Sequence, residues 1–491
     1  IVPLDYSHPH GRKIQLAVSR VRHTVSASKY QGVMLVNPGG PGGSGLILSI
    51  LGAFVPHNAG AAYDWIGFDP RGVGSSTPSL SCNRFFFHPD RPPYIPVTKS
   101  IMNRWVSRSK QYAADCAHAP NAALFRHVKT IDNVRDMESL RKALGKKQIN
   151  YYGFSYGTYL GQVYATLHPN RVRRFVLDSN VDPRHVFYRS NQQQDIAFQK
   201  TFNIYFKWIA KYHSVYHLGA TFRAVRHKYL ATVDRLNRHA ARGVLGGDEF
   251  TDVLTNAGYY VYNWEGIAKA WQNFANKHRP GQLINMYTSA NPTTRGGDNG
   301  YAIYLGTQCT DAWWPHSQQR LNRDNWQLNR KYNYFSWANA WFNGPCAYWK
   351  FHHAHPVNVT GKNVHVPILL IDETFDPATP YEGSLYIRHV FPTSRLIEGK
   401  NGTTHAGSLS GVACTDDTIA RYLKTGAVPR RKHHYGSDKV CPPVPKPNPL
   451  AGAATPSTAQ STAQPAVPAT AYAAAWAKVR AAIDAGSPVT G

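Results

Sequence analysis

Short runs of apolar and β-branched residues alternate with segments of helical periodicity through the N-terminal third of the chain. The runs that predict buried strands are residues 13–21, 32–37, 63–69, 148–152 and 172–178. Helices are expected between them, from about residue 130 to Gly145 and over residues 158–168. Strands separated by helices predict a mostly parallel central sheet that helices cover on both faces, which is an α/β fold.

The pattern changes over residues 182–356. Tyr, Trp, Phe, Gln and Asn recur there at helical spacing, and runs typical of buried strands are few. This segment therefore predicts a helical insertion into the sheet domain. Strand character returns at 364–372 and 394–397, and helices are expected at 380–389 and 415–425.

These changes divide the chain into four segments. Residues 1–181 and 357–443 are expected to form the two parts of the sheet domain, and 182–356 the insertion. Residues 444–491 form a tail that is rich in Pro, Ala, Thr and Ser to about residue 470, a composition typical of a flexible linker. Residues 471–485 predict a short Ala-rich helix.

The most informative motif is Gly153-Phe154-Ser155-Tyr156-Gly157. It joins a predicted strand to a predicted helix, which is the context that a G-x-S-x-G nucleophile elbow requires. The turn is so tight that glycines are needed on both sides of the serine. Ser155 is therefore the predicted catalytic nucleophile.

A serine hydroxyl is a weak nucleophile and needs a base that a carboxylate orients. Asp376 follows the predicted strand 364–372 in a loop that neighbouring prolines stiffen, and His405 follows the strand 394–397. Each residue alone also fits an ordinary role, as a helix N-terminal acid or an exposed loop histidine. Their order after Ser155, each behind a strand, predicts a Ser-His-Asp triad.

A glycine-rich segment, Asn-Pro-Gly-Gly-Pro-Gly-Gly-Ser-Gly at 37–45, follows the buried strand 32–37. Its glycines let bare backbone approach a substrate carbonyl, so we assign the N–H groups of Gly40 and Tyr156 to an oxyanion hole. The rival interpretation is a phosphate-binding loop, but no Gly-Lys-Ser/Thr follows.

The chain is strongly basic, with 55 Lys and Arg against 28 Asp and Glu, a formal net charge of +27. The basic residues are scattered, which favours a role in solubility, with weak association with anionic cell-wall polymers as a secondary expectation. No signature of specific nucleic-acid binding occurs. No apolar run is long enough for a membrane span, and the chain starts at Ile1 without a visible signal peptide.

The six cysteines include no C-x-x-C pair, which argues against a zinc ribbon or a redox site. Their grouping along the chain suggests the bridges 82–116, 309–346 and 414–441, one pairing among the several that six cysteines allow. Disulfides favour an extracellular location. The histidine-rich stretch 350–355 lacks the H-E-x-x-H frame, so we expect a solvated loop and neither a metal nor another cofactor.

Several of these motifs together carry a family resemblance. They are residues 37–45, 64–76, 153–157, 309–311, 345–349, 376–380, His405 and 414–429. This set resembles the secreted tripeptidyl aminopeptidases of actinomycetes, which belong with the prolyl aminopeptidases among the α/β-hydrolase serine peptidases. The resemblance covers about residues 1–443 and includes a C-terminal segment typical of that family.

The resemblance implies an α/β-hydrolase fold in which the 182–356 insertion is a cap domain over the active site. It also implies peptide substrates with a free N-terminus, whose amine needs an acidic partner. Our candidates for that partner are Asp195, Glu265, Asp311 and Glu382.

The sequence departs from the family pattern at two places near the predicted site. Thr404 stands before His405 where glycine is usual, and Asp-Ser-Asn at 178–180 replaces the commoner Asp-Gly. Neither departure removes a catalytic group, but both bear on the shape of the substrate pocket.

Three functions are compatible with these features. The leading hypothesis is a secreted serine exopeptidase that releases short peptides, tripeptides in the first instance, from free N-termini through an acyl-enzyme. The alternative is a carboxylesterase or small-amide hydrolase that uses the same triad, because a fold does not fix a substrate. A non-catalytic polyanion-binding protein would use the positive charge and leave the triad idle.

Overall fold

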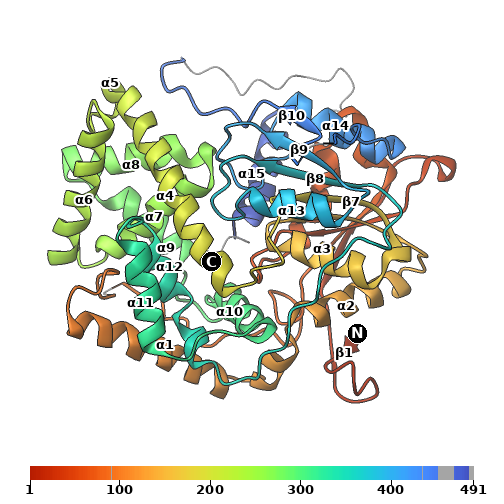
Figure 1. The fold of residues 1–491 in the computed structure, drawn as a ribbon, viewed down its shortest axis with the longest axis horizontal. Helices are drawn as coiled ribbons and strands as arrows, with labels where there is room; N and C mark the ends of the chain where they lie inside the picture. Colours follow the sequence, from red (N-terminus) through yellow and green to blue (C-terminus); the bar gives the residue numbers. More distant parts are fainter. Residues whose placement is uncertain (90, 434, 452–468, 486–491) are drawn as a thin grey trace.

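A computed structural model of the protein describes residues 1–89, 91–433, 435–451 and 469–485. Within these ranges, an eight-stranded sheet forms one half of the molecule (Figure 1). Neighbouring strands run parallel except at one edge, where β3 is antiparallel to β5. In order across the sheet the strands are β10 (Lys439–Cys441), β9 (Arg395–Gly399), β8 (Ile368–Glu373), β7 (Val172–Asp178), β6 (Ile149–Phe154), β4 (Val33–Asn37), β5 (Asp64–Phe68) and β3 (Val18–Val21).

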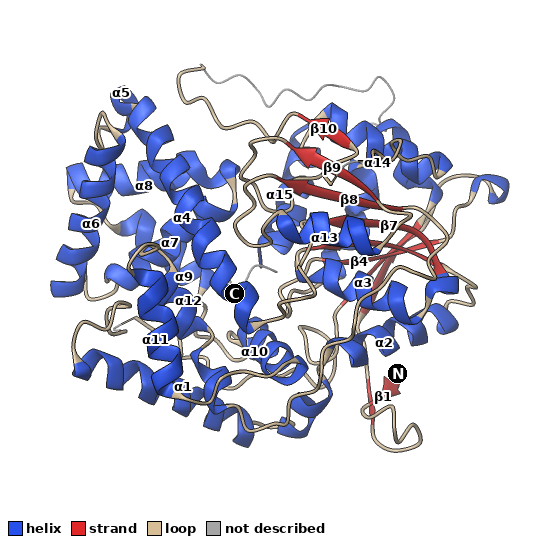
Figure 2. Ribbon diagram, in the orientation of Figure 1, coloured by secondary structure: helices blue, strands red, loops and turns tan. Residues whose placement is uncertain are grey.

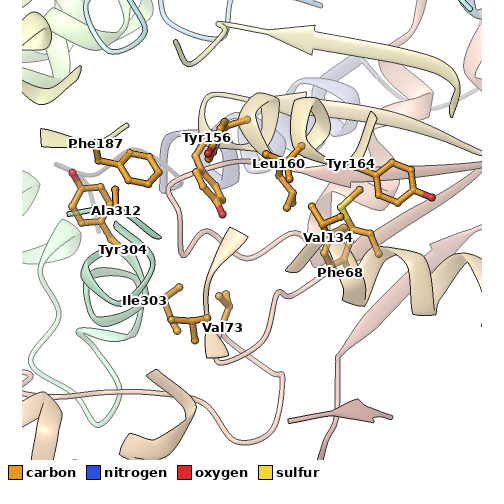
Figure 3. Close-up of a cluster of buried hydrophobic side chains, with 14 of the residues drawn as sticks. Phe68, Val73, Val134, Tyr156, Leu160, Tyr164, Phe187, Ile303, Tyr304 and Ala312 are labelled. Atoms are coloured by element: carbon orange, nitrogen blue, oxygen red, sulfur yellow. The ribbon is translucent and has the colours of Figure 1, made fainter. Parts of the chain in front are cut away.

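The central strands are apolar throughout because both faces of the sheet are covered. In β4, Val33 and Leu35 belong to one hydrophobic cluster, and Met34 and Val36 to the cluster on the opposite face. Helices α2 (Thr130–Ala143), α3 (Tyr156–Leu167) and α13 (Glu382–Val390) contribute to the first cluster. Figure 3 shows part of it, with Leu160 and Tyr164 on α3.

The second cluster lies under a different set of helices. It contains side chains of the 3₁₀ helix η2 (Leu46–Phe54), of α14 (Ala413–Thr425) and of α15 (Ala469–Ala485). The 3₁₀ helix η3 (Pro56–Ala62) packs on α14. A mostly parallel sheet between two helical layers confirms the predicted α/β fold class.

The strand expected at 13–21 is wrong as a single element. Residues Lys13–Ile14 form β2, which pairs with β1 (Val2–Pro3) outside the main sheet, and only β3 joins that sheet. Between them Gln15 pairs with Thr77, donating to its carbonyl at 2.8 Å and accepting from its amide at 2.9 Å. The chain therefore changes partners within a run whose residue types are all β-prone.

The segment between β7 and β8 is helical, as predicted, and its helices gather beside the sheet (Figure 2). They are α4 (Tyr188–Lys211), α5 (His213–Tyr216), α6 (Phe222–Arg238), α7 (Gly247–Tyr259), α8 (Trp264–Lys277), α9 (Gly281–Ala290), α10 (Asn299–Asp311), α11 (Gln318–Asn329) and α12 (Ser336–Phe342). Many of the aromatic residues of this segment form a hydrophobic cluster of their own, distinct from the two clusters of the sheet.

One helix from the N-terminal part of the chain packs with this insertion. Helix α1 (Lys99–His118) places Trp105 in a stack on Trp341 of α12, with ring centroids 5.6 Å apart. Just before α1, the buried Arg91 pairs with Glu249 and Asp252 of α7 at 3.1 and 2.7 Å. Conversely, α10 belongs to the insertion in sequence but contributes to the first cluster of the sheet domain.

Three disulfides join Cys82 to Cys116, Cys309 to Cys346 and Cys414 to Cys441, which confirms the predicted pairing. The predicted linker lies largely at 452–468, outside the described residues, and the helix expected at the end of the chain is α15. Across the described part of the chain, no helix combines the length and hydrophobicity that a membrane span needs.

Candidate active site

Ser155 occupies a sharp turn between β6 and α3. Its backbone has φ +54° and ψ −127°, a conformation that L-residues rarely adopt. The flanking glycines are required by space, because a Cβ on Gly153 would lie 2.6 Å from the carbonyl oxygen of Gly157. A Cβ on Gly157 would lie 2.8 Å from the carbonyl oxygen of Asn37. This is the geometry of a nucleophile elbow.

The glycine-rich segment after β4 lies directly against this elbow. Gly39 has φ +99°, and a Cβ there would come within 2.6 Å of the carbonyl oxygen of Phe154. The segment is tethered by side chains: Asn37 Oδ1 accepts from Gly39 N at 2.9 Å, and Asp69 Oδ1 accepts from Gly45 N at 3.1 Å. Bare backbone is thus held close to Ser155.

His405 and Asp376 form a buried pair. His405 Nδ1 lies 2.8 and 3.0 Å from the two carboxylate oxygens of Asp376. Asp376 is itself fixed, because its Oδ1 accepts from the amides of Ala378 and Thr379 and its Oδ2 from the Thr379 hydroxyl. A carboxylate can only accept, so Nδ1 carries the proton and Nε2 of the neutral ring is an acceptor.

Nε2 of His405 is buried and has no hydrogen-bond partner among the described residues. Ser155, Asp376 and His405 follow β6, β8 and β9, which run parallel, so all three lie beyond the same edge of the sheet. Substrates of open α/β sheets bind at this carboxyl edge. An unsatisfied buried acceptor in such a place is the chemical property that a general base needs.

The loop that carries His405 is irregular and strained. Ala406 and Leu409 have φ of +52° and +56°, in the left-handed region that side chains disfavour. Backbone amides of the loop are held from several elements. His405 N donates to the carbonyl of Tyr259 at the end of α7 (2.9 Å), and Ala406 N donates to Ser179 Oγ (2.7 Å).

Buried carboxyl groups hold further amides of the same loop. Glu373 accepts from Thr404 N at 2.5 Å, and Asp178 accepts from Ser408 N at 2.9 Å. Burial raises the pKa of Glu373 to about 8 and raises the pKa of Asp178 as well. These two carboxyl groups therefore help to hold the loop that carries His405.

A cavity of about 370 Å³ opens beside Ser155. Gly40 and Tyr156, the residues assigned to the oxyanion hole, line it together with Ser155 and Asp376. Its volume falls within the range of small-molecule sites. Residues of helix α4 also line the cavity, and the helix is joined to the Asp376 loop because Gln194 Nε2 donates to the carbonyl of Ala378 at 2.7 Å.

The four acids proposed to bind an amine lie in four different settings. Glu382, at the start of α13, lines the cavity that contains Ser155. Asp195 is buried against a second, smaller cavity and accepts from Asn339 at 2.9 Å. Asp311 accepts from Thr130 N at 2.8 Å, and burial raises its pKa to about 7. Glu265 is exposed on α8.

Comparisons with known proteins identify the family to which the chain belongs. The profile of the alpha/beta hydrolase fold matches residues 32–402. The chain is 36% identical over 463 residues to a tripeptidyl aminopeptidase of Streptomyces coelicolor, covering 91% of this chain and 83% of that protein. The chain therefore belongs to the α/β-hydrolase family. The tripeptidyl aminopeptidases are among its relatives there, which confirms the resemblance seen in the motifs.

Two proteins of Mycobacterium tuberculosis are more distant relatives. Serine protease Hip1 is 28% identical over 452 residues, covering 87% of this chain and 85% of that protein. Carboxylesterase B is 28% identical over 445 residues, covering 87% of this chain and 84% of that protein.

Some residues around the site carry no signal that the sequence analysis used. Ser179, directly after β7, and Tyr259 of the insertion hold the His405 loop although both are far from it in sequence. Gln193, Gln194 and Lys200 line the cavity from α4. The run of three glutamines at 192–194 on an aromatic-rich helix was the one available hint.

Ser179 has two opposite effects on the free energy of unfolding, a stabilising hydrogen bond and a strained backbone, and these can be tested separately. Its hydroxyl satisfies the amide of Ala406, but its φ is +66°. Ser179→Ala loses the bond and keeps the strain, which lowers the free energy of unfolding by about 1–3 kcal/mol. Ser179→Gly loses the same bond but relieves about 1–2 kcal/mol of strain, so it is the more stable variant in urea unfolding.

The same pair of substitutions at Ser28 is a control. Ser28 is exposed in the 3₁₀ helix η1 (Ala27–Lys29), and its φ is not positive. Glycine there increases the freedom of the unfolded chain without relieving strain, so the Gly variant should be the less stable one. A Ser179→Gly protein less stable than Ser179→Ala would contradict the role assigned to Ser179.

Proposed function

We propose that the protein is a serine exopeptidase that removes short peptides, tripeptides in the first instance, from free N-termini. The observation that carries this proposal is the pairing of Asp376 with His405, at the sheet edge where Ser155 occupies its elbow. Nδ1 of the histidine is held by a fixed carboxylate, and Nε2 is left as a buried acceptor. The names of two relatives, tripeptidyl aminopeptidase and serine protease, support hydrolysis of peptide bonds.

In the proposed reaction, His405 Nε2 takes the proton of the Ser155 hydroxyl as Oγ attacks the scissile carbonyl carbon. The carbonyl π electrons move to oxygen, and the backbone N–H groups of Gly40 and Tyr156 stabilise the resulting oxyanion. Tyr156 is the first residue of α3, so the positive end of that helix dipole adds to the stabilisation.

The intermediate then collapses and the C–N bond breaks. His405 gives its proton to the nitrogen of the leaving peptide, and the N-terminal fragment stays on Ser155 as an ester. Water attacks this ester while His405 takes a proton from it, and the released Oγ recovers that proton. The products are a short peptide with a new carboxylate and the shortened substrate, and Asp376 stabilises the imidazolium in both halves.

Recognition of a free N-terminus needs an acidic side chain that the substrate amine can reach. Glu382 lines the cavity that contains Ser155, and its carboxylate attracts a cationic α-amine bound there. Of the other two acids that line the cavity, Asp376 holds His405, and Asp182 is already paired with Arg184 at 2.6 Å. We therefore assign Glu382 as the partner of the substrate amine.

The disulfides of the enzyme bear on its cellular location. Three disulfides favour an oxidising, extracellular location. The mechanism uses side chains and backbone groups of this chain and calls for no cofactor. The formal charge of +27 supports weak association with anionic cell-wall polymers as a secondary property.

A matched set of fluorogenic peptides tests the proposed function. The set has acyl groups of one, two and three residues, each with a free or an acetylated N-terminus. We expect the free three-residue substrate to have the highest kcat/KM, and acetylation to lower it by at least about fivefold, because it removes the charge that pairs with Glu382. Ser155→Ala should lower kcat by a factor on the order of 10⁵ or more. Equal cleavage of acetylated and free peptides would refute the exopeptidase assignment.

The role of Glu382 makes a second prediction. Glu382→Gln should raise KM for free peptides about fivefold, the size of a solvent-screened ion pair, with kcat and all constants for acetylated peptides unchanged. Glu265→Gln is the matched control, because Glu265 is exposed on α8 and does not line the cavity. An equal effect of Glu382→Gln on free and acetylated substrates would exclude it as the amine partner.

A carboxylesterase is the second candidate, and one comparison favours it: the relative named carboxylesterase B covers 87% of this chain. The triad chemistry is common to both functions, so the substrate decides between them. Hydrolysis of p-nitrophenyl esters that is abolished in Ser155→Ala, together with no cleavage of any free peptide in the set, would establish the esterase in place of the exopeptidase.

A further inference from the structure

Helix α15 lies far along the chain from the triad, yet it packs behind the His405 loop. Val479 and Ile483 are buried in the second cluster of the sheet domain. Trp476 contacts Phe54 of η2, with ring centroids 4.5 Å apart. The helix is thus fixed to the sheet domain by an apolar face, and its polar residues are presented to neighbouring elements.

The buried Arg480 of α15 is bonded to the His405 loop. Its Nη1 donates to the carbonyl oxygen of Ala406 at 2.5 Å, and its Nη2 donates to that of Ser408 at 2.6 Å and to the hydroxyl of Ser410. Ala406 is the residue after the proposed base and has a left-handed backbone. The guanidinium therefore holds carbonyls of the strained loop whose amides are held by Ser179 and Asp178.

The charge of Arg480 also suits this place. Asp178, Asp416 and Asp484 are carboxyls whose pKa burial raises, and the charge of Arg480 acts against that rise in all three. Asp178 and Asp416 each accept amides of the loop, from Ser408 and Leu409 among others. The buried positive charge of Arg480 therefore favours the ionised form of the carboxyl groups that support the loop.

The same helix reaches the insertion. Asp484 accepts from the hydroxyl of Tyr262 at 2.6 Å, and the Arg480 guanidinium lies 5.7 Å from the centre of the Tyr262 ring. Tyr262 is three residues after Tyr259, whose carbonyl holds the amide of His405. Helix α15 therefore contacts the loop of the base and the part of the insertion that supports that loop.

We propose that α15 completes the active site and that Arg480 is a positioning residue for His405. Without the guanidinium, two carbonyls of the loop lose their donor and the left-handed turn at Ala406 loses a restraint on one side. The imidazole then samples orientations in which Nε2 is not directed at the serine hydroxyl. This inference rests on the proposed triad chemistry, in which His405 is the base.

The test compares Arg480→Ala, Arg480→Lys and the control Lys478→Ala in the full chain. Lys478 lies on the exposed side of the same helix. Rates are expressed per active site, titrated with a fluorophosphonate that labels Ser155 to completion. We expect Arg480→Ala to lower kcat about tenfold to a hundredfold with KM within about twofold, the pattern of a misplaced catalytic group. Arg480→Lys should recover part of kcat, and Lys478→Ala should match the unchanged protein.

An unchanged kcat per titrated site in Arg480→Ala would overturn the proposal, even if the thermal midpoint falls, because that result defines a purely structural role. If Arg480→Ala does not fold, Arg480→Lys decides: a reduced kcat at unchanged KM supports positioning, and a normal kcat overturns it. Ser155→Ala separates this inference from the proposed function. Activity surviving in Ser155→Ala refutes the triad itself, whereas an inactive Ser155→Ala beside a fully active Arg480→Ala refutes only the role of Arg480.

Discussion

The hydrogen bond between Asp376 and His405, at 2.8 Å, is the interaction on which the rest of the proposed site depends. It fixes which ring nitrogen carries the proton and leaves the other as an acceptor. The bond has this effect only if both loops stay in place, because neither residue lies in a helix or a strand. The Asp376 loop is fixed by its own amides and by Gln194 of α4. The His405 loop requires more, since part of its backbone is left-handed.

The support of the His405 loop explains several features that otherwise look unrelated. Buried acids at the ends of β7 and β8 accept its amides, and Ser179 adopts a disfavoured φ where its hydroxyl can do the same. The insertion contributes the carbonyl of Tyr259, so the proposed cap also orients the base. Strained loops persist at functional sites when their surroundings determine them fully, and this loop is determined from the sheet, the insertion and α15.

Much of the sheet domain could be predicted because the relevant signals are local. Strands such as β4 are buried on both faces, so they are apolar throughout, and a glycine-flanked serine between strand and helix defines its own turn. The prediction of a single strand over 13–21 was wrong because the chain changes its pairing partner at Gln15. The new partner, Thr77, is far away in sequence. Helix α1 was not predicted, and its largest side chain, Trp105, stacks on Trp341 of the insertion, which is far away in sequence.

The roles of the acidic residues near the site also depend on contacts between residues that are far apart in sequence. The family resemblance led to Asp195, Glu265, Asp311 and Glu382 as candidates, but only tertiary packing decides which of them lines the cavity beside Ser155. Asp311 instead accepts a hydrogen bond from Thr130 N, and burial raises its pKa to about 7. Arg480 gave no signal at all, because its partner carbonyls lie more than seventy residues earlier in the chain.

The most direct test of this account is to identify the acyl-enzyme. The protein would be quenched in acid during turnover of an activated tripeptide ester with a free amine, digested, and measured by mass spectrometry. The account predicts that the peptide containing Ser155 gains the mass of the three-residue acyl group, and that Ser155→Ala gains none. An adduct on another residue, or product that accumulates without an adduct on Ser155, would contradict it.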